Sequence, residues 1–351
     1  MDVAVNNLRN SLRDARWYPA DLDVARGLYQ LLPIDEELVD RATFLDTRLQ
    51  ADFSTASLLS LDAVAAAVER ASQPCWLLHT SFCCSTLLMR ALHLPPALVA
   101  LKEPLVLRRL SDARHAKVPI DGWIDPTVAL LSRPWESGSR VLVKPTHAAL
   151  NITAELMAAA PASRAVVLTS SLDDFLVSNI KKTAETQSKI PALVDRAVQA
   201  STLRYRLPRA ASSPPTWLAA AGLQWAAQRE LLVDIVAATG DRVRALDAKD
   251  LLADMPTTVA ACLVWWGIEV DAGRLSERIG LVSGSHAKAP ERAYDGEARR
   301  LEVAMLQRAF ATELRATKAW LDRAVLPYLR PQALDLCTGQ HALHSAGARD
   351  F

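Results

Sequence analysis

The chain has 351 residues, half of them apolar, and its 40 lysines and arginines balance 39 aspartates and glutamates. This length can bury a large core, either as one elaborated domain or as two. The near-neutral charge lacks the basic excess of a nucleic-acid binder, so we expect no nucleic-acid partner. Five cysteines without a C-x-x-C pair predict neither a disulfide framework nor a zinc motif, and they indicate a reduced, cytoplasmic setting.

No segment has the pattern of a membrane anchor. The N-terminus, MDVAVNNLRNSLRDARW, is too charged for a signal peptide. The longest uncharged stretch, Ala71–Met89, contains Pro74, His79 and several hydroxyl residues. That composition favours a buried strand and loop over a membrane span. We therefore expect no transmembrane segment.

The first part of the chain, residues 1–72, shows mainly helical patterns. The segments Asp21–Leu32 and Leu61–Ala71 carry apolar residues at helical spacing, and Ser57 and Ser60 are plausible caps for the second. We expect an N-terminal helical layer here rather than a separate module.

The central part alternates between short apolar runs and helical patterns. The runs predict five buried parallel strands: Trp76–His79, Leu98–Leu101, Arg140–Val143, Arg164–Thr169 and Arg242–Leu246. Between them, helical patterns cover Ser85–Leu94, Ala149–Ala159, Ser171–Lys182, Trp217–Thr239 and Pro256–Trp266. Such alternation predicts a P-loop-like, three-layer α/β fold, with a mostly parallel sheet flanked by helices.

Towards the C-terminus, Gly280–Ala293 has the composition of a polar loop, and a long helix is expected over about Glu297–Leu326, ended by Pro327. The last stretch, Pro331–Phe351, lacks periodicity, which predicts a loosely held tail. We expect residues 1–330 to form a single domain and residues 331–351 to form the tail.

One segment suggests an anion site. In Cys75–Arg90, CWLLHTSFCCSTLLMR, an apolar run ends in a small polar loop that opens a helix. Ligands of open α/β sheets bind beyond the carboxyl ends of the strands, where a helix presents free N–H groups. Ser81, Ser85 and Thr86 would add hydroxyl donors there. An ordinary helix cap at Ser81 or Ser85 is the alternative, and the absence of G-x-x-x-x-G-K-[ST] argues against an ATP or GTP hydrolase.

Together with later segments, this loop resembles that of the 3′-phosphoadenosine-5′-phosphosulfate-dependent sulfotransferases. That family's loop is P-[KR]-S-G-[ST]-T-[LW]-L, and FCCSTLL aligns with it through Ser85 and Thr86. Phe82 stands where the family has Lys or Arg, and Cys84 stands where it has Gly. The resemblance spans roughly Cys75–Ala293 and is closest to divergent bacterial members.

The other matching motifs follow in the family's order. LKEP supplies Glu103 where the family has a catalytic Glu or His, and VLVKP supplies Lys144. TSSLDDFLVS keeps the 3′-phosphate serine as Ser178 but has Ser170 in place of the arginine. SGSHAKAP resembles the late loop that closes over the nucleotide, with Lys288 as its basic residue.

The resemblance implies transfer of a sulfuryl group from 3′-phosphoadenosine-5′-phosphosulfate to a hydroxyl or amine of a small-molecule, glycan or peptide acceptor. We expect Glu103 to be the base, Lys144 to stabilise the leaving group, and His147 to contact the acceptor or to serve as the alternative base. No metal is expected, because a sulfuryl group carries less charge than a phosphoryl group. The expected cofactor contacts are Ser81, Cys84, Ser85, Thr86, Ser170, Ser178 and Lys288.

Several of these residues could have a structural role instead of a catalytic one. Glu103 could be a carboxylate paired with Lys102 or Arg108, and Lys144 a surface lysine at a strand end. Ser171 and Asp174 form a capping-box pattern. At the level of function, the alternatives are a P-loop-type kinase and a non-catalytic nucleotide-binding or assembly protein on the same scaffold.

Overall fold

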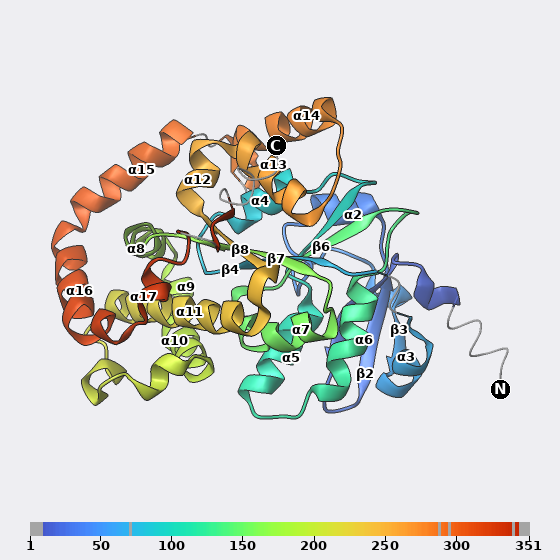
Figure 1. Cartoon of the computed structure of the whole chain (residues 1–351), viewed down its shortest axis with the longest axis horizontal. Coiled ribbons are helices and arrows are strands. Elements are labelled where there is room, and N and C mark those ends of the chain that lie inside the picture. Colours follow the sequence, from blue (N-terminus) through green and yellow to red (C-terminus); the bar gives the residue numbers. More distant parts are fainter. Residues whose placement is uncertain (1–9, 70–71, 287–288, 294–295, 339–340, 344–351) are drawn as a thin grey trace. The chain divides into compact units, whose positions relative to one another are not determined.

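The computed structural model of the chain describes residues 10–69, 72–286, 289–293, 296–338 and 341–343. Its main sheet has five strands in the order β5-β6-β4-β7-β8 (Figure 1). They span Leu98–Lys102, Arg140–Lys144, Cys75–His79, Arg164–Thr169 and Val243–Asp247. The pairs β4–β6 and β5–β6 are parallel. All five predicted strands are therefore confirmed, as is the α/β fold with a sheet flanked by helices.

These strands are continuous apolar runs because both faces of the sheet are covered. Every residue of β4 and β5 is buried, and in β6 only Arg140 is partly exposed. The predicted positions of the runs were correct for this reason. Both lysines at the strand ends, Lys102 and Lys144, share the burial of the apolar residues before them.

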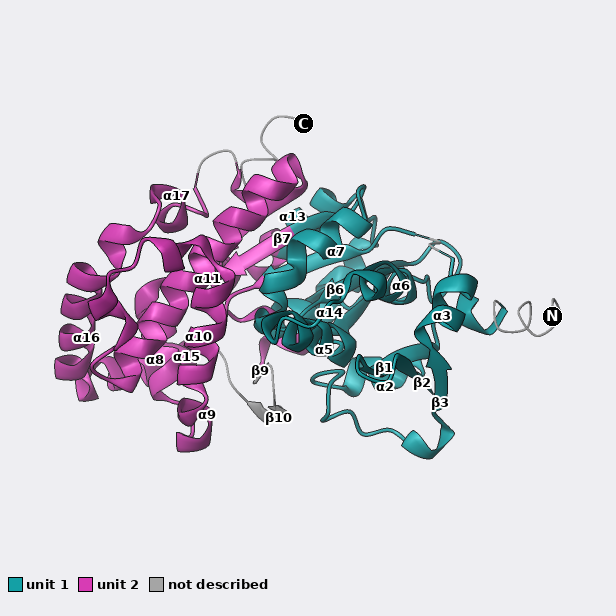
Figure 2. Ribbon diagram, turned by 90° about the horizontal axis from the view of Figure 1, so that it is seen from below, with its two compact units in different colours: residues 1–78, 86–165, 259–280 teal, residues 79–85, 166–258, 281–351 magenta. Residues whose placement is uncertain are grey.

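The chain divides into two compact units (Figure 2). The first comprises residues 1–78, 86–165 and 259–280, and the second comprises residues 79–85, 166–258 and 281–351. The expectation of one domain over residues 1–330 stays a prediction.

In the first unit, the helix expected over Asp21–Leu32 is wrong. Strands β1 (Trp17–Asp23), β2 (Leu28–Pro33) and β3 (Ser57–Ser60) form an antiparallel sheet in that order. Gly27, at a φ of +69°, lies between β1 and β2, a conformation that favours glycine. Burial alternates along part of β1 and β2, as period-two strands require. The N-terminal layer is thus strands plus short helices, rather than helices alone.

Short helices complete this layer. α2 covers Glu36–Arg41, and α3 covers Leu61–Ala67, where Ser60 accepts a hydrogen bond from the N–H of Ala63 as its predicted cap. The helices that follow in chain order are α4 (Ser85–Ala91), α5 (Leu105–His115), α6 (Asp121–Leu131) and α7 (Thr153–Ala159), with 3₁₀ turns η1 (Phe53–Thr55) and η2 (His147–Ile152).

The second unit is mainly helical. The long buried helix α11 spans Trp217–Thr239, as predicted, and Thr216 caps it. Other elements of this unit include α8 (Leu172–Ile180), α9 (Ala184–Ser188), α10 (Ile190–Ala200), η3 (Thr202–Tyr205), η4 (Arg209–Ser212), η5 (Gly240–Arg242), α12 (Ala248–Ala253), β9 (Ser285–His286), β10 (Ala289–Ala293) and η6 (Leu326–Tyr328). Most of α13 (Met255–Trp266) and of α14 (Ala272–Ser283) belongs to the first unit.

The expectation of one long helix over about Glu297–Leu326 is also wrong. This stretch forms two helices, α15 (Gly296–Ala309) and α16 (Ala311–Ala324), because Phe310 between them leaves helical geometry at φ −110° and ψ 25°. In addition, the first residues of the expected loop Gly280–Ala293 belong to α14.

The described part of the C-terminal segment is not loosely held. Pro331–Leu334 forms α17, and Ala333 and Leu343 are buried. The guanidinium of Arg229 donates to the carbonyl oxygens of Ala333 at 2.5 Å and Leu334 at 2.7 Å. These two hydrogen bonds from a buried guanidinium hold the segment against α11. The segment is therefore ordered although its sequence has no periodic apolar pattern.

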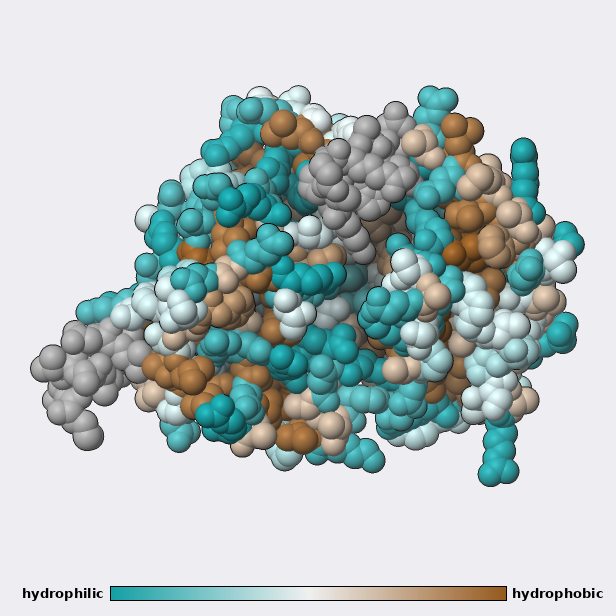
Figure 3. All heavy atoms as spheres, turned by 180° about the vertical axis from the view of Figure 1, so that it is seen from behind, coloured by the Kyte–Doolittle hydropathy of each residue, from teal (hydrophilic) through white to brown (hydrophobic). Residues whose placement is uncertain are grey.

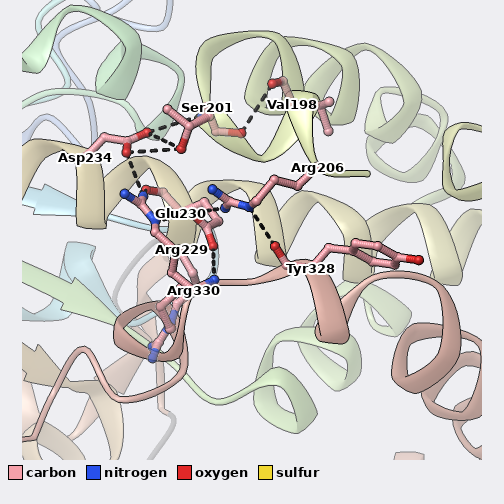
Figure 4. A network of polar contacts seen from close by, with 10 residues as sticks. Val198, Ser201, Arg206, Arg229, Glu230, Asp234, Tyr328 and Arg330 are labelled. Atoms are coloured by element: carbon pink, nitrogen blue, oxygen red, sulfur yellow. Dashed lines mark hydrogen bonds and ion pairs between the residues drawn. The ribbon is translucent and has the colours of Figure 1, made fainter. Parts of the chain in front are cut away.

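A buried charge network binds the same segment to α11 (Figure 4). The Glu230 side chain is fully buried, and its Oε2 lies 2.6 Å from Nη2 of Arg206 and 2.7 Å from Nε of Arg330. Arg330 also reaches Oδ1 of Asp234 at 2.6 Å, and Nε of Arg206 donates to the carbonyl of Tyr328. One carboxylate thus joins three segments that are distant in sequence.

On the face drawn in Figure 3, apolar residues are scattered among hydrophilic ones. The most exposed large apolar side chains of the described residues include Leu281, Leu301 and Met305. Among the described helices, none is both long and apolar enough to span a bilayer.

Candidate functional site

The loop after β4 has an unusual backbone. Phe82 and Cys84 both have left-handed φ values, +59° and +66°, which non-glycine residues rarely adopt. Cys84 stands where the sulfotransferase pattern has glycine, so the local conformation accounts for that preference. Successive N–H groups in such a turn form an anion-binding concavity. The loop therefore adopts two left-handed positions without a glycine.

Ser81 is buried and held by two glutamines of α11. Its N–H donates to Oε1 of Gln228 at 3.2 Å. Its hydroxyl oxygen accepts from Nε2 of Gln224 at 3.1 Å and from Nε2 of Gln228 at 3.2 Å. Sequence reasoning predicted Ser81 but missed both glutamines. Their four-residue spacing places both on one side of the helix, but nothing in the local sequence indicates that they contact Ser81.

Positive charge reaches this loop from other elements of the same unit. Nη1 of Arg299, on α15, lies 2.8 Å from Sγ of Cys84. Nζ of Lys182 lies 5.0 Å from the centre of the Phe82 ring, in a cation–π contact. Two cations of other elements therefore lie at the loop, one at Cys84 and one at the Phe82 ring. Arg299 was missed because it lies 215 positions away in sequence.

Ser85 and Thr86 begin α4 immediately after the loop, and both are buried. The neighbouring thiol of Cys83 donates to the carbonyl of Thr80 at 3.0 Å, which fixes the start of the turn. The two hydroxyl residues therefore lie where the sequence places them, at the first turn of the helix. Their contact with a cofactor stays a prediction.

The end of β7 supplies a second polar group in the same unit. Ser170 is 1% exposed, and its Oγ has no hydrogen-bond partner within the described residues. The indole of Trp225 donates to its carbonyl at 2.9 Å, and Nη1 of Arg229 reaches Oγ1 of Thr169 at 3.2 Å. Burial lowers the pKa of Arg229. A cation from α11 thus lies at Thr169, the residue before Ser170.

The capping box on α8 is confirmed. Oγ of Ser171 accepts from the N–H of Asp174 at 3.1 Å and donates to its carboxylate at 2.8 Å. Ser178 lies further along this helix and is half-buried. The cofactor role of Ser178 stays a prediction, and Lys288 lies outside the described residues.

In the first unit, Glu103 and Lys144 form an ion pair at the ends of adjacent strands. Nζ of Lys144 lies 2.5 Å from Oε1 of Glu103. The lysine side chain is fully buried and the glutamate side chain is 16% exposed. Glu103 has a φ of +57°, and its N–H donates to the carbonyl of Lys144 at 2.8 Å. This strained backbone turns the carboxylate toward the ammonium.

The ion partner of Glu103 in this structure is Lys144, a pairing that the sequence did not indicate. Of the two partners considered, Arg108 pairs with Asp112 at 2.8 Å, and the ammonium of Lys102 donates to the carbonyl of Asp40 at 2.9 Å. Lys144 is buried rather than a surface lysine. His147 begins η2 three residues later and is half-buried. Its role stays a prediction.

A second charged cluster surrounds Asp40 in this unit. Oδ1 of Asp40 lies 2.7 Å from Nη2 of Arg278 and 3.8 Å from Nε2 of His93. Burial lowers the pKa of Lys102 to about 8, and Arg278 adds to this effect. Burial also lowers the pKa of His93 to about 4, although the Asp40 carboxylate opposes this. The native state therefore favours a neutral imidazole at position 93.

This pKa predicts acid sensitivity. The unfolded chain binds a proton at His93 below about pH 6.5, whereas the folded chain does so only near pH 4. Stability should therefore fall by about 3 kcal/mol as the pH drops through this window. Denaturant unfolding at the two ends of the window measures the loss, which His93→Gln should remove and the more exposed His115→Gln should leave intact. Equal wild-type stability at both pH values would contradict the prediction.

Within the described residues, no group of three or more His, Cys, Asp or Glu side chains is arranged to hold a metal ion. No family model matches the chain, and no curated protein matches it. Solved structures of sulfotransferases are similar to it. A sulfotransferase from Alicyclobacillus acidocaldarius is 14% identical with a TM-score of 0.37, covering 74% of this chain and 99% of its own.

The sulfotransferase domain from the curacin biosynthetic pathway is 11% identical with a TM-score of 0.42, covering 77% of this chain and 97% of its own. A sulfotransferase from Mycobacterium tuberculosis H37Rv is 15% identical with a TM-score of 0.32, covering 88% of this chain and 92% of its own. Likeness at this level does not transfer an activity, and the chain's own residues must support any function.

Proposed function

We propose that the protein is a sulfotransferase, which moves a sulfuryl group from 3′-phosphoadenosine-5′-phosphosulfate to a hydroxyl or amine of a small-molecule, glycan or peptide acceptor. The observation that carries the proposal is the loop Thr80–Ser85, with its two left-handed residues and the guanidinium of Arg299 at Cys84. This is an anion site built without the lysine of a nucleotide hydrolase. The free state of all five cysteines is compatible with a cytoplasmic location.

The loop would hold the anionic part of the donor. Its N–H groups supply fixed dipoles, and Arg299 and Lys182 supply the charge that the loop itself lacks. Arg229 and the unpartnered hydroxyl of Ser170 would serve the nucleotide end, in place of the arginine of the resembling motif.

The ends of β5 and β6 would supply the acid–base chemistry. Glu103 takes the proton of the acceptor hydroxyl or amine as its oxygen or nitrogen attacks sulfur. The bond from sulfur to the bridging oxygen breaks, and adenosine 3′,5′-bisphosphate leaves with the electron pair. Lys144 orients the carboxylate and adds positive charge at the strand ends.

Binding of the product tests the proposal directly. We expect wild-type protein to bind adenosine 3′,5′-bisphosphate in isothermal titration calorimetry, and Arg299→Gln to bind it about tenfold more weakly, because a charge-assisted hydrogen bond is lost. Arg315→Gln, on the exposed side of α16, is the matched control. No wild-type binding at millimolar concentration would refute the proposal. Binding without sulfuryl transfer to any acceptor would favour the non-catalytic alternative.

A further inference from the structure

The side chain of Gln228 is anchored at both ends of its amide. Oε1 accepts from the backbone N–H of Ser81 at 3.2 Å, and Nε2 donates to Oγ of the same residue at 3.2 Å. A backbone N–H can only donate, so it fixes which end of the amide is the oxygen. Gln228 is 2% exposed, and water does not compete for these bonds.

The hydrogen bonds of the Ser81 hydroxyl restrict what it can do next. A hydroxyl has two lone pairs and one hydrogen. Gln228 donates to one lone pair, and Nε2 of Gln224 donates to the other at 3.1 Å. Only the O–H remains to form a further bond. Ser81 is 3% exposed, so that hydrogen needs an acceptor inside the structure or on a ligand.

We propose that Gln228 is a positioning residue for the loop Thr80–Ser85. It makes the Ser81 hydroxyl an obligate donor, so that Ser81 selects a ligand group with a free lone pair, such as an oxygen of a sulfate or phosphate, over a group that can only donate, such as an ammonium. The amides of Gln224 and Gln228 achieve this selection through occupied lone pairs, without adding a charge. The inference rests on the proposed function, in that the loop is taken to bind an oxyanion.

The isosteric variant Gln228→Glu tests this assignment. Its carboxylate still accepts from the Ser81 N–H but also accepts the Ser81 O–H, which turns the hydroxyl away from the ligand. We expect affinity for adenosine 3′,5′-bisphosphate to fall by at least about tenfold in calorimetry. Gln307→Glu adds the same charge on the exposed side of α15, and it should change affinity by less than about twofold.

A double-mutant cycle separates this role from a merely structural one. Repulsion by the new carboxylate acts whether or not Ser81 has its hydroxyl, and it cancels in the cycle. The loss caused by Gln228→Glu should therefore be at least about fivefold smaller in a Ser81→Ala background. Equal losses in the two backgrounds, or no loss in the first, would overturn the inference. The proposed function would survive that result as long as wild type binds.

A buried carboxylate at position 228 can also prevent folding. Gln228→Met then replaces it, because it removes both hydrogen bonds without a charge and enters the same cycle. Coupling with Ser81→Ala is expected again, and additivity would refute the assignment. If folded wild-type protein binds no bisphosphate at millimolar concentration, the proposed function and this inference both fail.

Discussion

Glu103→Gln is expected to lower kcat for sulfuryl transfer by about 1000-fold, within the range that a general base contributes. The glutamine amide keeps the shape of the side chain, and its oxygen can still accept from the buried ammonium of Lys144. It cannot take up the acceptor proton. The loss should therefore appear in kcat, whereas affinity for adenosine 3′,5′-bisphosphate, measured by calorimetry, should change little.

Glu37→Gln is the matched control, since it removes an exposed carboxylate of α2 that pairs with Arg41 on the same helix. Its kcat should equal that of wild type. A Glu103→Gln enzyme that retains more than about a tenth of the wild-type kcat would show that Glu103 is not the base. His147 would then be the next candidate, and His147→Gln would test it.

The parallel strands could be predicted because burial on both faces leaves a simple signal. β4 and β5 contain no exposed residue, and their sequences are almost wholly apolar. β1 and β2 gave a misleading signal, since apolar residues in Asp21–Leu32 also fit a helical repeat. The sequence feature that favoured two strands was Gly27, which forms the turn between them. A single glycine is a weaker signal than an apolar periodicity over twelve residues.

Some features of the candidate site could likewise be predicted from the sequence, and others could not. The positions of Glu103 and Lys144 could be predicted because Lys144 is the last residue of the apolar strand β6 and Glu103 comes directly after β5, at the ends of strands where ligands of α/β sheets bind. Their direct contact was not, because it depends on the left-handed backbone of Glu103 and on the register of β5 against β6. The cations at the loop depend on tertiary packing alone. Neither the sequence around Arg299 nor that around Lys182 contains a pattern that points to Phe82 or Cys84.

The same dependence on distant partners makes Glu230 the most sensitive structural residue of the second unit. Its fully buried carboxylate lies 2.6 Å from the guanidinium of Arg206 and 2.7 Å from that of Arg330. Glu230→Gln leaves these two cations without their buried counter-charge. We expect the free energy of unfolding to fall by about 3–5 kcal/mol, which chemical denaturation of the full chain measures.

Glu313→Gln, near the start of α16, removes an exposed carboxylate and should change the free energy of unfolding by less than about 0.5 kcal/mol. If the cost at Glu230 arises from unpaired cations, removing one of them should restore stability. We therefore expect Glu230→Gln with Arg206→Met to be more stable than Glu230→Gln alone, because the double variant removes the cation that lost its carboxylate, whereas Arg330 keeps its ion pair with Asp234. A double variant that loses the sum of both single effects would show that Glu230 acts through packing rather than charge.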